Sequence, residues 1–379
     1  MTDQKIGILG GGQLGKMLCQ EASKLGIRLN VLEKDDSFPA AAICPDVTYG
    51  DFKNKEDVLN FGSKMDIVTV EIEAVNTEAL YMLEKSGIKV YPQPHILDLI
   101  KDKGLQKTWY VENNIPTSYF QLFENAQEVI DAVNNNTWQY PFVQKIRTDG
   151  YDGQGVRIIK SKADLKSLLN RPCLLEQLVD IDKEISVIVA QNPAGEIKSF
   201  PLVEMEFHPT ANLVEYLFSP SSLSQKDQKN ATLLAESIAK KMGIIGLLAV
   251  ELFLTKGGNI IINEVAPRPH NSGHQTIEGN LTSQYAQHLR AIMNLPLGDT
   301  QATSPSVMVN ILGEVGHQGK AKYNGIKAAL NISGANIHIY GKEMTKPFRK
   351  MGHATIIAQD LDTAKNKAKK LKSVLKVTT

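Results

Sequence analysis

Glu251 and Glu264 flank a segment that reads as two β-strands around a Gly-Gly pair at 257–258. A Gly-Gly pair between apolar runs predicts a tight β-hairpin. If Lys256 faces Asn259 across the turn, Glu251 faces Glu264 with the Cβ atoms about 5 Å apart, where like charges repel. Two carboxylates that share an open site suit Mg²⁺, which completes its shell with water and phosphate oxygens. The pair therefore predicts a magnesium site, and the alternative is an exposed hairpin face with two solvated glutamates.

The next stretch, residues 263–274, is the densest polar run of the chain. His270 and His274 have the i, i+4 spacing of a metal-binding helix, but two prolines and a glycine in the same stretch oppose a helix. We therefore favour a loop in which Arg268 and Asn271 bind an anion close to the metal.

A glycine-rich segment, residues 147–155, follows a strand-like run that ends at Lys145. A mobile glycine-rich hairpin beside a lysine can place its amides on a polyphosphate and close off water, as phosphoryl transfer requires. A plain surface hairpin explains the glycines equally well but leaves Lys145 unexplained. We therefore expect a nucleotide lid over these residues.

Gly10, Gly12 and Gly15 lie between a predicted strand and a predicted helix, and Glu33 ends the following strand. This spacing satisfies the dinucleotide fingerprint, so an NAD-binding dehydrogenase is an alternative of a different class. Backbone amides at a helix N-terminus bind any phosphate or other anion, so the motif does not select NAD. A tight strand-to-helix turn would require the same glycines.

The pattern of predicted helices and strands divides the chain into three regions, which must position these residues. Residues 1–95 alternate strand-like and helix-like runs, which indicates a parallel, Rossmann-like α/β sheet. Residues 96–297 have an α+β texture, and residues 298–379 hold short strands and a lysine-rich helix. We expect three domains with these bounds. The predicted strands are 6–9, 29–32, 67–70, 88–91, 142–145, 156–160, 173–178, 185–190, 307–312, 335–340 and 353–358, and the predicted helices are 14–25, 226–242 and 363–375.

Composition excludes several classes of protein. The net charge of +1 over 379 residues gives no global attraction for nucleic acid or an anionic membrane. No signal peptide or membrane-spanning apolar run is present, so we expect a soluble, cytoplasmic protein. Cys19, Cys44 and Cys173 are widely spaced, which predicts reduced, buried thiols and neither a disulfide framework nor a zinc site.

Taken in chain order, the charged residues and the glycine-rich segment resemble the ATP-grasp superfamily; they are Lys107, Lys145, 147–155, Glu176, Glu184, Glu251, Asn263 and Glu264. The runs at 148–155 and 263–274 resemble one family within it, the N5-carboxyaminoimidazole ribonucleotide synthetases. The resemblance extends to Arg-Lys-Met-Gly-His at 349–353 and covers essentially the whole chain. Asp149 departs from the pattern, because the family is expected to have glycine there.

The resemblance implies an ATP-grasp fold with an N-terminal parallel α/β domain and a small β-rich C-terminal domain. It also implies ATP- and bicarbonate-dependent carboxylation of 5-aminoimidazole ribonucleotide through carboxyphosphate, with Mg²⁺ as cofactor and a homodimer as the assembly. Another ATP-grasp ligase or a formyl-transfer enzyme would keep the ATP residues and change the acceptor pocket.

The resemblance also assigns roles to individual residues. ATP would contact Lys107, Lys145, Gly150, Asp152, Gly153, Gly155, Glu176, Gln177, Leu178, Glu184 and Asn263, with Glu251 and Glu264 as metal ligands. The carboxylation site would be lined by Tyr151, Arg268, His270 and Asn271. The acceptor nucleotide would contact Gln13, Leu14, Glu73, Tyr151 and Arg268, with Lys342 and Arg349 on its phosphate.

Overall fold

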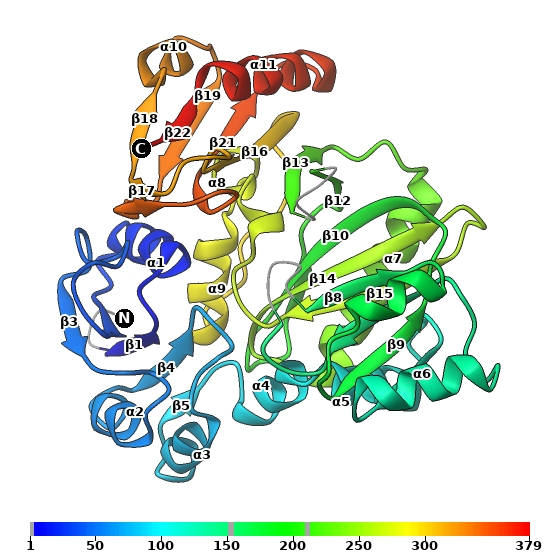
Figure 1. The fold of residues 1–379 in the computed structure, drawn as a ribbon. Coiled ribbons are helices and arrows are strands. Elements are labelled where there is room, and N and C mark those ends of the chain that lie inside the picture. Colours follow the sequence, from blue (N-terminus) through cyan, green and yellow to red (C-terminus); the bar gives the residue numbers. More distant parts are fainter. Residues whose placement is uncertain (1–3, 151–154, 209–212) are drawn as a thin grey trace.

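In the computed structural model, which describes residues 4–150, 155–208 and 213–379, the N-terminal segment forms a parallel sheet of order β3-β2-β1-β4-β5 (Figure 1). Its central strands are fully buried and rich in Ile, Leu and Val, as expected for a sheet covered on both faces. The strands are β1 (Ile6–Leu9), β2 (Leu29–Glu33), β3 (Asp46–Tyr49), β4 (Ile67–Val70) and β5 (Lys89–Val90). The predicted parallel α/β sheet is confirmed.

Helices cover both faces of this N-terminal sheet. α1 (Gln13–Ser23) packs on one face, and α2 (Lys55–Gly62) and α3 (Thr77–Lys85) pack on the other. Neither β3 nor α2 is predicted from the sequence. β3 is a short strand with half-buried and exposed residues, and α2 is a short helix, so both give a weak periodic signal.

A small antiparallel sheet of order β6-β9-β7-β8 follows two consecutive helices, α4 (Pro94–Lys101) and α5 (Lys103–Glu112). Its strands are β6 (Phe120–Phe123), β7 (Phe142–Ile146), β8 (Val156–Ile159) and β9 (Cys173–Gln177). α6 (Ala126–Asn134) and the 3₁₀ helix η1 (Lys162–Ser167) complete this unit. β7 and β8 pair antiparallel on either side of the glycine-rich segment.

The central sheet has the order β15-β14-β10-β12-β13-β16-β21-β19, with β11 paired to β10. Its strands are β10 (Ile181–Gln191), β11 (Ile197–Ser199), β12 (Val203–Phe207), β13 (Val214–Ser219), β14 (Gly246–Thr255), β15 (Ile260–Ala266), β16 (Ser306–Leu312), β19 (Ala335–Ile339) and β21 (Lys350–Ile357). Because β13 pairs with β16, the C-terminal strands continue the sheet of the central part.

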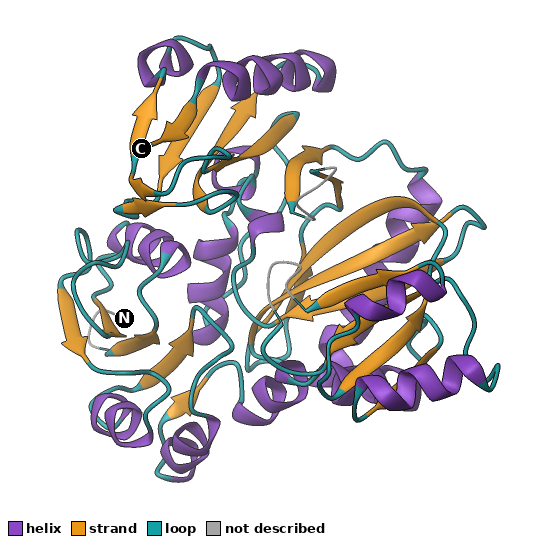
Figure 2. Ribbon diagram, in the orientation of Figure 1, coloured by secondary structure: helices purple, strands orange, loops and turns teal. Residues whose placement is uncertain are grey.

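Two helices pack against opposite faces of β10 and β14. α7 (Gln225–Met242) shares an apolar core with one face, and α9 (Gln284–Ile292) packs on the other. α9 also contacts α1, so it stands between the N-terminal sheet and the central sheet (Figure 2). The short helices η2 (Asn271–Gly273) and α8 (Thr276–Gly279) precede it. This helix therefore fixes the N-terminal domain against the strands that carry the two glutamates.

The C-terminal part is rich in strands, as expected. α11 (Leu361–Val374) packs on β16 and β21 through Ala364, Ala368 and Leu371, which confirms the helix predicted at 363–375. The remaining elements are β17 (Gly319–Lys320), β18 (Lys322–Asn324), α10 (Ile326–Leu330), β20 (Met344–Thr345) and β22 (Lys376–Thr378). The three domain bounds stay a prediction.

The structure bears on two points raised by the composition, the membrane-spanning segments and the cysteines. Within the described residues, none of the helices combines the length and the apolar character needed to cross a membrane. Cys19, Cys44 and Cys173 are free and buried, as predicted.

Candidate active site

Glu251 and Glu264 are paired across the β14–β15 ladder, which confirms the predicted neighbourhood. The predicted register is wrong next to the turn, where Thr255 donates its N–H to Asn259 O at 2.9 Å. The loop therefore has three residues, and Leu252 pairs with Ile262. A bulge at Asn263, which lies opposite no residue, restores the register at the glutamates.

A cation lies against one of the two carboxylates. Lys103, the first residue of α5, places Nζ 2.6 Å from Glu264 Oε2. Lys103 lowers the pKa of Glu264, whereas burial and then repulsion from Glu264 raise the pKa of Glu251. The ammonium group of Lys103 therefore offsets the charge of Glu264, whereas the predicted magnesium ion at the two carboxylates stays a prediction.

Lys107 and Lys145 converge on Glu176 of β9. Glu176 contacts Lys107 Nζ at 3.1 Å and Lys145 Nζ at 3.0 Å, and its side chain is 6% exposed. Although burial opposes ionisation, Lys145 and Lys107 lower the pKa of Glu176. The three residues form a buried charged cluster, so the Glu176 side chain binds lysines in this structure.

The two lysines differ in what they can still bind. Lys107 Nζ also contacts Thr117 Oγ1 at 2.6 Å and Ser118 Oγ at 2.9 Å, which uses all of its N–H donors. Lys145 Nζ donates to Asn263 Oδ1 at 3.1 Å and keeps one N–H without an acceptor among the described residues. The bulge at Asn263 supplies this contact. Lys145 is therefore the better placed lysine for a phosphate.

An ion pair anchors the start of the glycine-rich segment. Arg147 makes two-pronged contacts to Asp102, with Nη2–Oδ2 at 2.7 Å and Nε–Oδ1 at 3.0 Å. Lys103 N–H donates to Arg147 O at 2.9 Å. The residues that begin α5 thus hold both Arg147 and Glu264.

The glycine-rich segment is described only at its ends. Gly150 precedes and Gly155 follows the undescribed residues, so Tyr151, Asp152 and Gly153 lie outside the described part of the chain. Asp149 has φ 63°, a left-handed conformation that favours glycine, and this explains why glycine is expected there. Asp149 instead binds Arg171 at 2.9 Å.

Glu184, Gln177 and Leu178 lie near the lysine cluster in the fold. Gln177 ends β9 and Leu178 follows it, both exposed, while Glu184 is part of β10 next to β14. Burial raises the pKa of Glu184 to about 7, and Lys145 opposes this shift. Their assignment to ATP stays a prediction.

Arg268 connects the central sheet to the N-terminal domain. Its Nη2 lies 2.9 Å from Glu73 Oε1. Arg268 and Glu73 are far apart in the sequence. Arg268 Nε is buried without a partner among the described residues. His270 Nδ1 contacts Ser272 Oγ at 2.9 Å and lies 3.7 Å from Glu251 Oε1. The structure thus places His270 beside Glu251, and it places Arg268, from the same loop, beside Glu73.

Asn271 links this loop to the C-terminal part. Its amide and that of Asn310 in β16 exchange two hydrogen bonds of 2.9 Å each. His274 is buried against Tyr285 Oη, 3.1 Å away. Among the described residues no group of three or more His, Cys, Asp or Glu is placed to hold a metal ion. The assignment of Glu251 and Glu264 to Mg²⁺ stays a prediction.

The predicted phosphate-binding cations lie on the turn before β21. Lys342 Nζ donates to Lys350 O at 2.8 Å, and Arg349 Nη1 donates to Met344 O at 2.6 Å. From the other side, Lys16 of α1 donates to Ile339 O at 2.9 Å and Tyr340 O at 3.2 Å. The N-terminal helix that carries Gln13 and Leu14 is therefore fastened beside this turn.

The glycine-rich loop before α1 already binds carboxylates of the protein itself. Glu71 accepts from Gly12 N at 2.6 Å and Gly15 N at 2.8 Å, and Glu33 accepts from Gly11 N at 3.0 Å. In a dinucleotide-binding fold these amides face a pyrophosphate. Their internal partners argue against the NAD-binding alternative.

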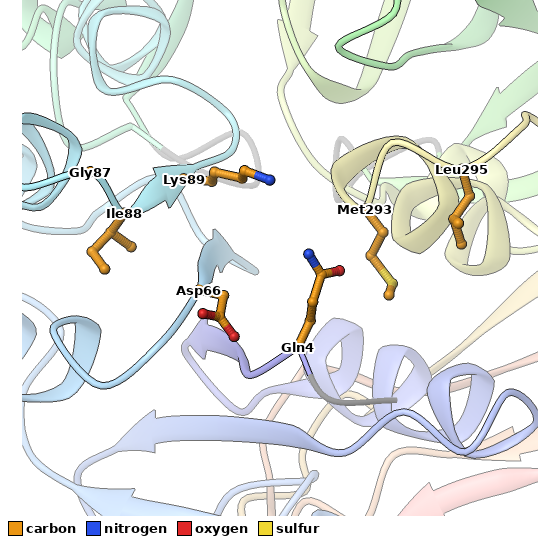
Figure 3. Close-up of a pocket in the computed structure, with 7 residues that line it drawn as sticks. All are labelled: Gln4, Asp66, Gly87, Ile88, Lys89, Met293 and Leu295. Carbon is orange, nitrogen blue, oxygen red and sulfur yellow. The ribbon is translucent and has the colours of Figure 1, made fainter. Parts of the chain in front are cut away.

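A separate cavity lies away from this site (Figure 3). It is lined by Gln4, Asp66 and Lys89 at the amino ends of parallel strands, and by Met293 and Leu295 after α9. The glycine-rich loop follows the carboxyl end of β1. The cavity therefore opens at the opposite edge of the N-terminal sheet.

Lys103 and Glu71 are the two residues that the sequence reasoning misses. Lys103 stands four residues before Lys107, on the same helical face, so the i, i+4 spacing is a signal that could have found it. Glu71 follows a buried strand directly, and no spacing to Gly12 marks it.

Three family models match successive parts of the chain. A ribonucleotide synthetase preATP-grasp domain matches residues 3–101, an ATP-grasp domain matches 108–285, and a phosphoribosylaminoimidazole carboxylase C-terminal domain matches 306–367. Phosphoribosylaminoimidazole carboxylase of Ogataea methanolica is 38% identical over 95% of this chain, which spans 68% of that protein.

Solved structures match over nearly the full length. N5-carboxyaminoimidazole ribonucleotide synthetase from Thermotoga maritima is 40% identical, with a TM-score of 0.91 and 99% coverage of both chains. N5-carboxyaminoimidazole synthase from Aspergillus clavatus, in complex with ADP and 5-aminoimidazole ribonucleotide, is 32% identical, with a TM-score of 0.90 and 98% coverage of both chains.

Proposed function

The chain belongs to the N5-carboxyaminoimidazole ribonucleotide synthetase family of ATP-grasp ligases, and from this premise we propose that it carboxylates 5-aminoimidazole ribonucleotide with ATP and bicarbonate. A bicarbonate oxygen attacks the γ-phosphorus of ATP, which gives carboxyphosphate and ADP. The exocyclic amine of the acceptor then attacks the carboxyl carbon, inorganic phosphate leaves, and the amine loses a proton. The product is N5-carboxyaminoimidazole ribonucleotide.

The observation that carries this proposal is the meeting of two separate parts of the fold at Arg268. On one side Arg268 contacts Glu73 of the N-terminal domain at 2.9 Å. On the other side the same loop carries His270, 3.7 Å from Glu251. An acceptor held by the N-terminal domain is thereby brought to the place where phosphate chemistry is expected.

The donor set fits Mg²⁺. Two carboxylates from neighbouring strands share one position of the ladder, and a lysine ammonium already lies 2.6 Å from one of them. Glu251 and Glu264 would hold the metal, which would neutralise charge on the β- and γ-phosphates when bound. Lys145 keeps an N–H for a phosphate oxygen, and Lys103 would turn from Glu264 to the nucleotide once a metal replaces it.

The acceptor contacts are also part of the proposal. Glu73 accepts hydrogen bonds from the ribose, the amides of Gln13 and Leu14 face the same nucleotide, and Lys342 and Arg349 bind its phosphate. Arg268 and His270 orient bicarbonate and the amine, and Asn271 fixes their loop to β16 through Asn310. Closure of residues 147–155 over ATP would keep water from hydrolysing carboxyphosphate.

The decisive experiment measures ADP release with bicarbonate and 5-aminoimidazole ribonucleotide present together, singly and not at all. We expect full turnover only with both. ADP release that does not depend on the aminoimidazole nucleotide, but does depend on another phosphorylated amine, would instead favour another ATP-grasp ligase or a formyl-transfer enzyme. A nicotinamide-binding titration tests the dehydrogenase alternative, for which we expect no binding.

A cytoplasmic location and a homodimer belong to the proposal as well. Sedimentation of the purified protein tests the assembly, with the dimer mass as the expected result. A monomer at assay concentration would contradict it.

A further inference from the structure

Glu71 lies at the carboxyl end of β4, directly beside the glycine-rich loop of α1. Its own N–H donates to Leu9 O at 3.1 Å, which fixes its backbone to the N-terminal sheet. The side-chain oxygens take two different amides of the loop, Gly12 N–H at 2.6 Å and Gly15 N–H at 2.8 Å. A carboxylate that accepts two backbone N–H groups makes charge-assisted hydrogen bonds, which are stronger than neutral ones.

The glycines of the loop fit this carboxylate closely. A Cβ atom on Gly12 would lie 2.3 Å from Glu71 Oε1, and one on Gly10 would lie 2.7 Å from Glu71 Cγ. Neither position can carry a side chain while Glu71 stays in place. The need for glycine here is explained by a residue of the chain itself, without an external phosphate.

The amides of the loop divide into two sets. Gly11, Gly12 and Gly15 donate to Glu33 or Glu71. The amides of Gln13 and Leu14, at the first turn of α1, have no acceptor within the described part of the chain. Because Gly10 N–H donates to Leu32 O at 3.1 Å, Glu71, Glu33 and Leu32 O together leave two amides of residues 10–15 for a ligand, within the described part of the chain.

The surroundings of Glu71 connect the loop to the candidate active site. Burial raises the pKa of Glu71, while the Gly15 and Gly12 amides and the charge of Arg268 oppose this shift. Two residues further on, Glu73 contacts Arg268 at 2.9 Å. The segment 71–73 thus contacts both parts. Glu71 binds the glycine-rich loop, and Glu73 binds the Arg268 side chain.

We propose that Glu71 is a positioning and specificity residue of the acceptor site, in which its carboxylate is the resident anion of the glycine-rich loop. It keeps phosphate groups out of the loop and holds the amides of Gln13 and Leu14 toward the acceptor. The identity of that acceptor rests on the proposed function, whereas the role of the carboxylate does not.

The first test removes the carboxylate of Glu71 from the glycine-rich loop. Glu71→Ala should lower the melting temperature, and sodium acetate should raise it again in a saturable way, because acetate can take the place of the lost carboxylate. Sodium chloride at equal ionic strength should not. The matched control is Glu84→Ala, which removes an exposed glutamate of α3 in the same domain. Equal acetate effects on wild type, Glu84→Ala and Glu71→Ala would overturn the proposal.

The second test separates the two substrates. The loss of a charge-assisted acceptor in Glu71→Ala should raise KM for 5-aminoimidazole ribonucleotide about tenfold, with KM for ATP little changed. Acetate should reverse this rise. Unchanged KM values for both substrates would contradict the positioning role. If the wild type shows no turnover with this nucleotide, the proposed function fails, and the acetate melting test still decides the role of Glu71.

Glu71→Gln carries the test if the alanine variant does not fold. The glutamine fills the same space but presents an NH₂ donor to one of the two amide N–H groups. We expect a lower melting temperature that acetate does not restore, together with a raised KM for the acceptor. A glutamine variant with wild-type melting temperature and wild-type KM would overturn the proposal.

Discussion

Glu251 and Glu264 share one position of the ladder, but their surroundings differ. Glu264 is 43% exposed and has an ammonium partner 2.6 Å away, whereas Glu251 is 11% exposed and faces His270 at 3.7 Å. One carboxylate is therefore neutralised in the metal-free protein, while the other experiences burial and repulsion. Substitution of the two residues should have unequal effects.

Glu251→Gln and Glu264→Gln should each reduce ADP formation about 100-fold or more, because each removes a proposed metal ligand. Their stabilities without Mg²⁺ should diverge. Glu251→Gln should hold or raise the melting temperature, because a neutral amide is free of the burial and repulsion that raise the pKa of Glu251. Glu264→Gln should lower the free energy of unfolding by about 1–3 kcal/mol, because Lys103 loses its partner. Melting curves and an ADP assay measure both effects.

The double variant Lys103→Met, Glu264→Gln is the control for this difference. Removal of both partners should recover most of the stability lost in Glu264→Gln alone. Near-normal turnover in either single glutamine variant would contradict the metal assignment. A Glu264→Gln protein as stable as wild type would contradict the ion pair with Lys103.

The pH dependence of stability should report Glu251. Burial, with repulsion from Glu264, raises its pKa from 4.5 to about 8, so the folded state holds a proton that the unfolded state releases. Stability from this group is present below its unfolded pKa and is lost as pH rises toward 8. Burial lowers the pKa of His274 and of His353, so these two groups make stability rise with pH. This rise ends near 6.5, the ordinary pKa at which the unfolded histidines lose their protons.

Between pH 6.5 and 8, melting temperatures measured with EDTA should therefore fall in the wild type and fall less steeply in Glu251→Gln. Saturating Mg²⁺ should reduce the wild-type slope, because the metal binds the ionised carboxylate. Parallel curves for the two proteins would show that Glu251 is already ionised at the lower pH.

At the scale of elements, the start of α5 and the end of β7 form one rigid junction. Asp102 caps α5 by accepting from Gly104 N and Leu105 N, and the same carboxylate holds Arg147. Arg147 leads into the glycine-rich segment, while neighbouring Lys103 reaches Glu264. The junction therefore joins the expected nucleotide lid to the expected metal ligand.

Gly104→Ala should disturb this junction without touching a ligand-binding side chain. A Cβ there would lie 2.9 Å from Arg147 Nε and 3.0 Å from Asp102 Oδ1, so the ion pair must shift. We expect KM for ATP to rise about threefold to tenfold, comparable to the loss of one hydrogen bond to a charged group. Gly257→Ala is the matched control, because its Cβ would meet nothing closer than 3.7 Å. Equal KM values in the two variants would contradict the role of the junction.

The sequence predicts those elements whose signal is local. Alternating apolar runs predict β1, β4 and β10, and the glycine pair at 257–258 predicts the hairpin that brings Glu251 opposite Glu264. Lys145 and Asn263 are named as site residues from the resemblance, and the structure joins them at 3.1 Å. Their shared assignment to ATP stays a prediction.

The features that the sequence does not predict are one-residue shifts of strand register and contacts between residues far apart in the chain. The bulge at Asn263 changes the register by one, and no residue type announces it. Glu71 meets Gly12 across 59 positions of the chain, and the pairing of β13 with β16 joins regions that the sequence separates into two domains. Such contacts follow from packing of the whole chain and leave no periodic trace.

At the scale of the whole molecule, the candidate site lies where all three parts of the chain meet. The N-terminal domain contributes Glu73, the central sheet contributes the carboxylate pair, and the C-terminal part contributes Asn310. The cationic turn of the C-terminal part is the proposed contact for the acceptor phosphate. Lys16 fastens α1 to Tyr340, and His338 binds Glu278 at 2.7 Å. These contacts hold the N-terminal domain, α8 and the C-terminal strands together.

Arg349→Ala should test whether the turn before β21 binds the phosphate of the acceptor. A charge-assisted contact to a phosphate contributes about 1.5–3 kcal/mol, so KM for 5-aminoimidazole ribonucleotide should rise about tenfold or more. KM for ATP should change little, and steady-state kinetics with each substrate varied measures both. Lys346→Ala removes an exposed cation of the same turn and serves as the control.

Equal increases in both KM values would indicate a folding defect, because Arg349 also donates to Met344 O at 2.6 Å. No increase at all would place the phosphate elsewhere. The amides of Gly12 and Gly15 are not the alternative place, since Glu71 already occupies them.

The central sheet continues into the C-terminal strands, so the strands from β15 to β21 are joined in one sheet, from which the small sheet of β6 to β9 is separate within the described part of the chain. The hydrogen-bonded ladder from β15 to β21 resists hinge bending between the carboxylate pair and the turn that carries Arg349. Within residues 4–150, 155–208 and 213–379, the small sheet of β6 to β9 shares no ladder with it, and this small sheet carries one side of the expected nucleotide site. The ladder thus ties the carboxylate pair to the turn that carries Arg349, and we expect an opening that admits ATP to be a rotation of the small sheet relative to this ladder. Distance measurements between labels on β8 and β15 would record that rotation, whereas labels on β15 and β21 would keep a constant separation.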